Sequence, residues 1–241
     1  MKFLDLTQPL TTSTPRSSDH PQVEYPVLRH YSTHGTLTRE IRASLHSGTH
    51  VDAASLYDPA GKNIDDLPLE GFCGSGVVVD VSDLGDWGEV TDKVLDERAS
   101  EVGAGDIIAM WTGFSQYYST DEERYVLKSP GLDRSGVDWL VNRKVRAMYS
   151  DNASSEHIFM RARQWRQLRP DIFDGVEIDP YRFPRAYAHK QMLPAGIMMV
   201  EHLSTALGQL VGQRVNLLAF PAKYAGVEAA PARVAAVLEY P

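Results

Sequence analysis

The chain has 241 residues, of which 43% are hydrophobic and 23% charged, a size and composition typical of one globular α/β domain. Its formal net charge of −8 argues against a nucleic-acid-binding protein, which would carry a clustered basic surface. The one cysteine, Cys73, excludes an intrachain disulfide and a thiolate metal cluster. Because no run of about 18 apolar residues exists and Asp5 interrupts the apolar N-terminal stretch, we expect a cytoplasmic protein without a membrane span.

Apolar patterning predicts a series of short strands and fewer helices. Residues 4–6 form a first strand, and the near-alternation of apolar and polar residues over 36–45 predicts a half-buried strand that leads to His46. Short apolar runs predict further strands at 77–79, 106–110, 145–149, 196–200, 215–220 and 233–238. Helical character is found at 91–98, 137–142 and 161–168. Strands outnumber helices, and no linker is visible. We therefore expect a single α/β domain over residues 1–241, with a mixed sheet and a layer of short helices on one face.

An expanded segment over residues 152–188 is rich in aromatic residues and is broken by prolines. Long excursions of this kind are often lids or substrate-binding loops, and a plain surface elaboration is an equal alternative. The segment contains the one local basic run of the chain. We interpret this run first as a solvated face and second as a contact to an anionic ligand; its members are Arg161, Arg163, Arg166 and Arg169.

The stretch HSGTHVD places two imidazoles and a carboxylate, those of His46, His50 and Asp52, within seven residues. On an extended strand, positions four apart would lie roughly 13 Å apart, too far to share one ion. We therefore predict a turn around Gly48, where glycine supplies the φ freedom. These ligand types suit Zn²⁺, Mn²⁺ or Fe²⁺ and leave room for a water. The alternative is that each histidine is an ordinary core or surface residue.

Two later residues are candidates to complete this site. His189 and Glu201 stand twelve positions apart, with a turn at 194–196 between them. A helix that ends before the turn and a strand that runs to Glu201 could bring both side chains to one point. Alone, this pair is weak evidence, because the two could be a helix residue and a solvated strand end.

HSGTHVD resembles the first part of the signature H-x-G-T-H-x-D-x-P-x-H of the metal-dependent cyclase family. This family includes bacterial kynurenine formamidases, isatin hydrolase and some polyketide ring cyclases. Further similarities follow in family order over nearly the whole chain; they are LDLTQPL at the start, the strand 105–108 with Thr112-Gly113, Asp151, the pair His189 and Glu201-His202-Leu203, and Phe220-Pro221. The resemblance implies a mixed-sheet domain of the family's swivelling β/β/α type, and a homo-oligomer, either a dimer or a tetramer.

The chain also departs from this signature, since Ala54 and Leu56 stand where the family has proline and the last histidine. Leucine can neither hold a second ion nor carry a proton. The resemblance therefore implies one divalent metal, Zn or Mn, held by four ligands: His46, His50, Asp52 and Glu201. His189 is then the predicted proton carrier, and Tyr57 a weaker substitute donor.

The resemblance implies a hydrolase that uses metal-activated water on a cyclic amide, a lactone or an N-formyl amide attached to a ring. Aromatic residues are predicted to contact that ring: Trp111, Phe114 and Trp165, although a core role is the favoured interpretation for Trp111. A ring-forming cyclase or dehydratase of natural-product biosynthesis is a second hypothesis. A non-catalytic member that binds a small ligand is a third, supported by the loss of the last histidine.

Overall fold

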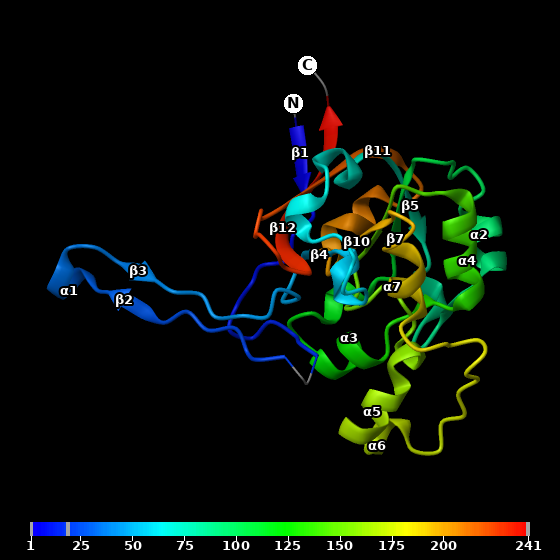
Figure 1. The fold of residues 1–241 in the computed structure, drawn as a ribbon, viewed down its shortest axis with the longest axis horizontal. Coiled ribbons are helices and arrows are strands. Elements are labelled where there is room, and N and C mark those ends of the chain that lie inside the picture. The colour runs from blue at the N-terminus through cyan, green and yellow to red at the C-terminus, as the bar shows by residue number, and fades with distance from the viewer. Residues whose placement is uncertain (1, 18–19, 240–241) are drawn as a thin grey trace.

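The computed structural model describes residues 2–17 and 20–239, and its centre is a mixed β-barrel (Figure 1). Eight strands form one sheet; in sheet order they are β1 (Lys2–Asp5), β12 (Ala229–Glu239), β11 (Arg214–Pro221), β5 (Cys73–Asp80), β7 (Ile107–Trp111), β9 (Ala147–Ser150), β10 (Met198–Glu201) and β4 (His50–Asp52). Strand β4 also pairs with β12, so seven of these strands close into a barrel, with β1 attached outside the ring. The run from β5 through β7 and β9 to β10 is parallel, and the other pairings are antiparallel.

The α/β class expected from the sequence is confirmed, but closure of the sheet was not predicted. Closure depends on β12, whose eleven residues pair in turn with β1, β11 and β4. It depends equally on β4, which is only three residues long and pairs on both sides. A strand of three residues is too short to show a hydrophobic period, so the sequence pattern alone could not predict that the sheet closes.

The core divides between the inside and the outside of the barrel. Side chains alternate between the two along a strand, so Val78 belongs to the inner cluster, whereas Val77 and Val79 belong to the outer one. The outer cluster fills the space between the parallel strands and three helices, namely α2 (Asp92–Arg98), α4 (Arg134–Arg143) and α7 (Tyr187–Met192). The predicted helix layer thus exists, but it covers part of a barrel wall.

Shorter elements complete the described chain. Helix α3 (Glu122–Leu127) packs with α5 (Ala162–Leu168) and α6 (Pro170–Phe173) around a third buried cluster. A small parallel ladder joins β6 (Glu89–Val90) to β8 (Gly131–Leu132). Single 3-10 turns occupy Ala54–Leu56, Ile64–Asp66, Leu69–Phe72, Ser82–Leu84, Phe114–Tyr117, Ile158–Arg161 and Thr205–Leu210. No helix within the described ranges is long and apolar enough to span a membrane.

A hairpin arm projects from the barrel, and it corrects the prediction for residues 36–45 (Figure 1). The arm consists of β2 (Val27–Arg29), the short helix α1 (Tyr31–His34) and β3 (Thr38–Arg39). Only two residues of the predicted strand are extended in the ladder, and Ile41 is 55% exposed. The half-buried strand is therefore wrong, because the alternation reflects an arm with no core beside it.

Candidate functional site

The site is built on strand β4, which carries His50 and Asp52 on the same face because side chains two apart on a strand point the same way. Val51 between them faces the core and is fully buried. In the antiparallel pairing with β10, Glu201 lies directly opposite His50. Register alone thus places one imidazole and two carboxylates on one surface at the end of the barrel.

The predicted turn before β4 brings in the third residue of the motif. Gly48 has φ of +65°, a left-handed conformation that strains other residues. A Cβ at this position would also lie 3.1 Å from Cδ1 of Leu10 and 3.3 Å from the hydroxyl of Tyr118. The hydroxyl of Thr49 donates to the His202 carbonyl over 2.6 Å and anchors the turn. His46 therefore folds back over the strand, as its distance from His50 in the chain required.

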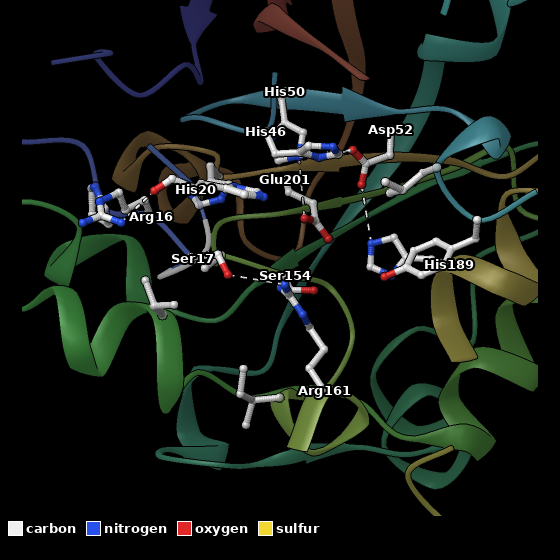
Figure 2. Close-up of a pocket in the computed structure, with 17 residues that line it drawn as sticks. Arg16, Ser17, His20, His46, His50, Asp52, Ser154, Arg161, His189 and Glu201 are labelled. Carbon is white, nitrogen blue, oxygen red and sulfur yellow. Dashed lines mark hydrogen bonds and ion pairs between the residues drawn. The ribbon is translucent and has the colours of Figure 1, made fainter. Parts of the chain in front are cut away.

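Three possible ligand atoms of the motif converge on one point (Figure 2). Nδ1 of His46 lies 3.2 Å from Nε2 of His50 and 2.9 Å from Oδ1 of Asp52, and the His50 to Asp52 distance is 3.2 Å. A tetrahedral cation with bonds of about 2.0–2.2 Å holds neighbouring ligand atoms roughly 3.3 Å apart. Oδ1 of Asp52 is buried and accepts no hydrogen bond among the described residues. The cluster therefore has the donor types and the spacing of a divalent-metal site.

The protein fixes which ring nitrogen of each histidine faces this point. Nδ1–H of His50 donates to the carbonyl of Gly48 over 2.9 Å, which leaves the lone pair of Nε2 directed at the cluster. Nε2 of His46 lies 3.5 Å from a carboxylate oxygen of Glu228, so its Nδ1 is the inward nitrogen. Outer partners that orient an imidazole in this way are typical of metal ligands.

The carboxylate of Glu201 is oriented by the main chain. The amide of Ser155 donates to its Oε1 over 2.7 Å, and its Oε2 lies 4.0 Å from Nε2 of His50. Burial and the neighbouring negative charge of Asp52 raise the pKa of Glu201. Burial opposes the charged form of Asp52 as well, but the adjacent imidazoles of His46 and His50 hold its pKa well below the usual value. These shifts favour the negative charge on Asp52 over that on Glu201.

His189 reaches the same carboxylate from the other side of the site, on helix α7 (Figure 2). Its Nε2 lies 3.5 Å from Oδ2 of Asp52, and its Nδ1 lies 3.1 Å from Oε2 of Glu156. Asp52, His189 and Glu201 form a second group of possible ligand atoms within 4.8 Å of one another. Burial disfavours the imidazolium, but the carboxylate of Glu156 outweighs it, and the pKa of His189 lies well above its usual value.

Tyr57 and Leu56 border this side of the pocket. The ring centroid of Tyr57 lies 5.3 Å from that of His189, and the Tyr57 side chain is partly exposed. Burial raises the pKa of Tyr57, so the phenol stays protonated at neutral pH. Leu56 lines the pocket without offering a ligand or a proton, as the departure from the signature implied.

The three aromatic residues predicted to contact substrate do not line the pocket. The indole of Trp111 packs against the backbone of Gly208 and the barrel core. Phe114 and Trp165 are buried in the third cluster, behind the pocket wall. The structure therefore supports the core role for Trp111, and it places the other two rings in the packing that holds the wall.

The pocket around the cluster is small, about 110 Å³, and contains residues that the sequence did not identify. His202 is one; its φ is +61°, its Nδ1 lies 2.8 Å from the hydroxyl of Tyr125, and its ring lies 5.5 Å from that of His50. Burial and the nearby His50 lower the pKa of His202, so it is neutral. Glu156, which lies behind the lining against His189, was not identified either, because its place in an irregular segment gives no pattern. Arg161 points into the pocket opposite the cluster (Figure 2).

The fold is thus an α/β domain built on a closed barrel of mixed strands. Its cluster of His, Asp and Glu side chains is suited to a divalent cation. The chain belongs to the cyclase family, because residues 4–157 match the family model described as "Putative cyclase". The family resemblance drawn from HSGTHVD is thereby confirmed.

Relatives of known name match the chain over different shares of their length. The chain is 23% identical over 233 residues to the kynurenine formamidase of Bacillus mycoides, covering 96% of this chain and 95% of that one. It is 31% identical to the kynurenine formamidase of Bacillus anthracis over only 84 residues, 40% of that chain. The structure of isatin hydrolase A from Labrenzia aggregata, bound to benzyl benzoate, aligns with a TM-score of 0.80 and 22% identity, covering 98% and 93% of the two chains. This last match shows a shared fold.

Proposed function

We propose that this protein is a metal-dependent hydrolase that cleaves an amide or lactone bond in a small ring-containing molecule. The observation that carries the proposal is the convergence of three inward ligand atoms, from His46, His50 and Asp52, at spacings suited to one cation. Glu201 supplies a fourth ligand through Oε2, and the cation is zinc or manganese. The names of the relatives, kynurenine formamidase and isatin hydrolase, support cleavage of an N-formyl or cyclic amide.

A cation bound there supplies Lewis acidity, which polarises a carbonyl and lowers the pKa of water. The remaining chemistry belongs to side chains of this chain. Glu156 holds the imidazole of His189 through Nδ1, so Nε2 faces the reacting group. The positive charge of a bound cation would oppose protonation of His189, so its Nε2 would accept a proton from the attacking water and return it to the leaving nitrogen or oxygen. Tyr57, protonated and adjacent to His189, donates a hydrogen bond to the substrate beside this path.

The size of the pocket limits what reacts there. A volume of about 110 Å³ is on the scale of one small ring with its reacting carbonyl, so a larger molecule extends beyond it. The side chains of His50, Asp52 and Glu201 in this pocket are buried, which shields the reacting group from bulk water. The rest of the substrate must extend outward, past Tyr57 and Leu56.

Metal analysis followed by a substrate screen tests this function. Purified protein is expected to contain zinc or manganese in about one-to-one ratio and to hydrolyse N-formyl anilines, isatin-like lactams or dienelactones. Water labelled with heavy oxygen should enter the product acid. Ring closure or loss of water without label would replace the hydrolase with a cyclase or dehydratase. Absence of both metal and turnover would support a non-catalytic ligand-binding protein.

We also propose that the protein forms a dimer or tetramer through its arm. The arm exposes apolar side chains to solvent: Leu28 is 59%, Tyr31 65% and Ile41 55% exposed. Apolar groups gathered on a projecting hairpin are typical of an interface. Light scattering should give the mass of an oligomer, and the double variant Leu28→Ser/Ile41→Ser should shift it toward 26.8 kDa.

A further inference from the structure

A second and larger cavity adjoins the small pocket. It has a volume of about 980 Å³, within the range of sites for small-molecule ligands. The two cavities share four lining residues, namely His20, Leu56, Tyr57 and Arg161. A molecule in the outer cavity can therefore reach the His, Asp and Glu cluster without leaving the protein surface.

The charge of the outer cavity is opposite to that of the molecule. Among the described residues that line it, the charged side chains are all arginines, Arg161, Arg163, Arg166 and Arg185, and none is acidic. The whole chain has a formal net charge of −8. An arginine-only wall in an acidic protein concentrates positive potential at one place and attracts anions.

These arginines lack carboxylate partners within the described part of the chain. Other arginines of the protein pair with acids, as Arg169 does with Glu123 and Arg182 with Asp133. In contrast, Nη2 of Arg161 has only the hydroxyl of Ser17 at 3.4 Å, and Nη2 of Arg166 donates to a main-chain carbonyl. The Arg163 and Arg185 side chains are exposed and make no ion pair with any described residue. Their guanidinium groups are available to a ligand.

Apolar side chains complete the cavity wall. Phe159 and Phe183 lie edge to face, with ring centroids 5.3 Å apart, and Ile178 and Leu56 line the same space. Arg166 lies at the far edge, beside a neighbouring hollow that contains three acidic residues. The other three arginines, Arg161, Arg163 and Arg185, do not line that acidic hollow, and Arg161 also lines the inner pocket.

We propose that the outer cavity binds an anionic group, a carboxylate or a phosphate, carried on an apolar or aromatic substrate. Arg161, Arg163 and Arg185 hold the anion, since a planar guanidinium forms paired hydrogen bonds with either group. The apolar wall holds the ring, and the reacting carbonyl enters the inner pocket. The last statement rests on the proposed hydrolase function, but the binding of the anion does not.

Equilibrium binding of simple aryl anions tests the site. Phenylacetate and phenyl phosphate are the probes, and benzyl alcohol is the neutral control, each titrated into purified full-length protein by calorimetry. The double variant Arg163→Gln/Arg185→Gln should bind the anions about tenfold more weakly or worse, the scale expected for losing charge-assisted hydrogen bonds. The matched control Lys93→Gln/Lys223→Gln also removes two positive charges, but from exposed positions elsewhere, and it should bind the anions like the wild type.

The remaining outcomes separate the possibilities. Tighter binding of phenyl phosphate would identify a phosphate-bearing substrate, and tighter binding of phenylacetate a carboxylate-bearing one. Equal affinity for benzyl alcohol, or unchanged anion affinity in the arginine variant, would overturn the proposal. If the anions bind at the arginines but no amide or lactone is hydrolysed, the cavity assignment stands and the hydrolase assignment fails.

Discussion

The two connected cavities are built in different ways. The inner pocket is placed on paired strands, where register sets His50 opposite Glu201. The outer cavity is formed largely by the segment between residues 159 and 186, which consists of a 3-10 turn, helix α5 and the less regular chain that follows. The inner pocket gathers imidazoles and carboxylates, and the outer one gathers arginines and aromatic rings. In the proposed function, the barrel holds the groups that do the chemistry, while the segment over residues 159–186 selects what reaches them.

The largest expected effect comes from removing a ligand of the inner pocket. Asp52→Ala should empty the metal site and abolish turnover together, because Asp52 contacts His46, His50 and His189. Metal content by mass spectrometry and initial rates on the same preparation provide the measurement. Asp58→Asn, an exposed acid six residues later, should leave both unchanged. Full activity in Asp52→Ala would remove the inner pocket as the site of chemistry.

Removing the proposed proton carrier should be less severe. His189→Asn should keep the metal and slow the reaction by about 10²- to 10⁴-fold, the usual scale for acid–base catalysis. Glu156→Gln should lower kcat more than it changes KM, since it acts through the orientation of His189. Steady-state kinetics with metal analysis measures both variants. A His189→Asn protein with wild-type kcat would contradict the assignment.

His157 links Trp87 to the start of the segment that lines the outer cavity, and its burial should make the stability of the protein depend on pH. Nε2–H of His157 donates to the Trp87 carbonyl, and its Nδ1 accepts from the amide of Phe159. Burial lowers the pKa of His157 to about 4, because a charged ring would lose its hydration. Protonation of Nδ1 would also end the hydrogen bond that this nitrogen accepts from Phe159. The unfolded chain, with a pKa near 6.5, then binds more protons than the folded one between pH 6.5 and 4. The free energy of unfolding should therefore fall by about 3 kcal/mol as the pH drops through this window.

Denaturant unfolding at several pH values measures this loss. His157→Gln keeps one donor and one acceptor but does not titrate, so its unfolding free energy should vary less with pH than that of the wild type. Groups elsewhere, including the metal ligands, also titrate here, and the difference between the two proteins isolates His157. Parallel curves for the two proteins would refute the prediction.

The smallest effect is expected at the turn that forms the inner pocket. Gly48→Ala should cost about 1–2 kcal/mol in the free energy of unfolding, because alanine is strained at positive φ. The new Cβ also presses on Leu10, which should tilt His46 and weaken metal binding. Gly35→Ala, also at positive φ but with open space around it, is the matched control for strain alone. Equal metal affinity in the two variants would show that the turn does not position the ligand.

The sequence predicted local features of the site better than the way distant parts meet. The ligand set of HSGTHVD and the bend at Gly48 follow from chain reach and glycine geometry, and the structure confirms the bend. The pairing of Glu201 with His50 depends on strand register, which no local pattern encodes. The partner of His189 was missed for a related reason, since Glu156 lies in irregular chain.

The same limit explains the incorrect expectations. Alternation over residues 36–45 resembles a half-buried strand, but the hairpin has no sheet to cover it. Aromatic residues predicted to contact substrate, such as Trp165, are buried behind the wall instead. The first interpretation of the arginine run, a solvated face, agrees with the exposure of Arg163 and Arg166, but the sequence could not show that the distant Arg185 lines the same cavity.

A crystal structure of protein grown with zinc or manganese tests the central claim most directly. Anomalous diffraction at the absorption edge of the metal should show one strong peak within bonding distance of Nδ1 of His46, Nε2 of His50 and Oδ1 of Asp52. A map without a peak at this point, with those side chains turned apart and the metal bound elsewhere or absent, would contradict the account.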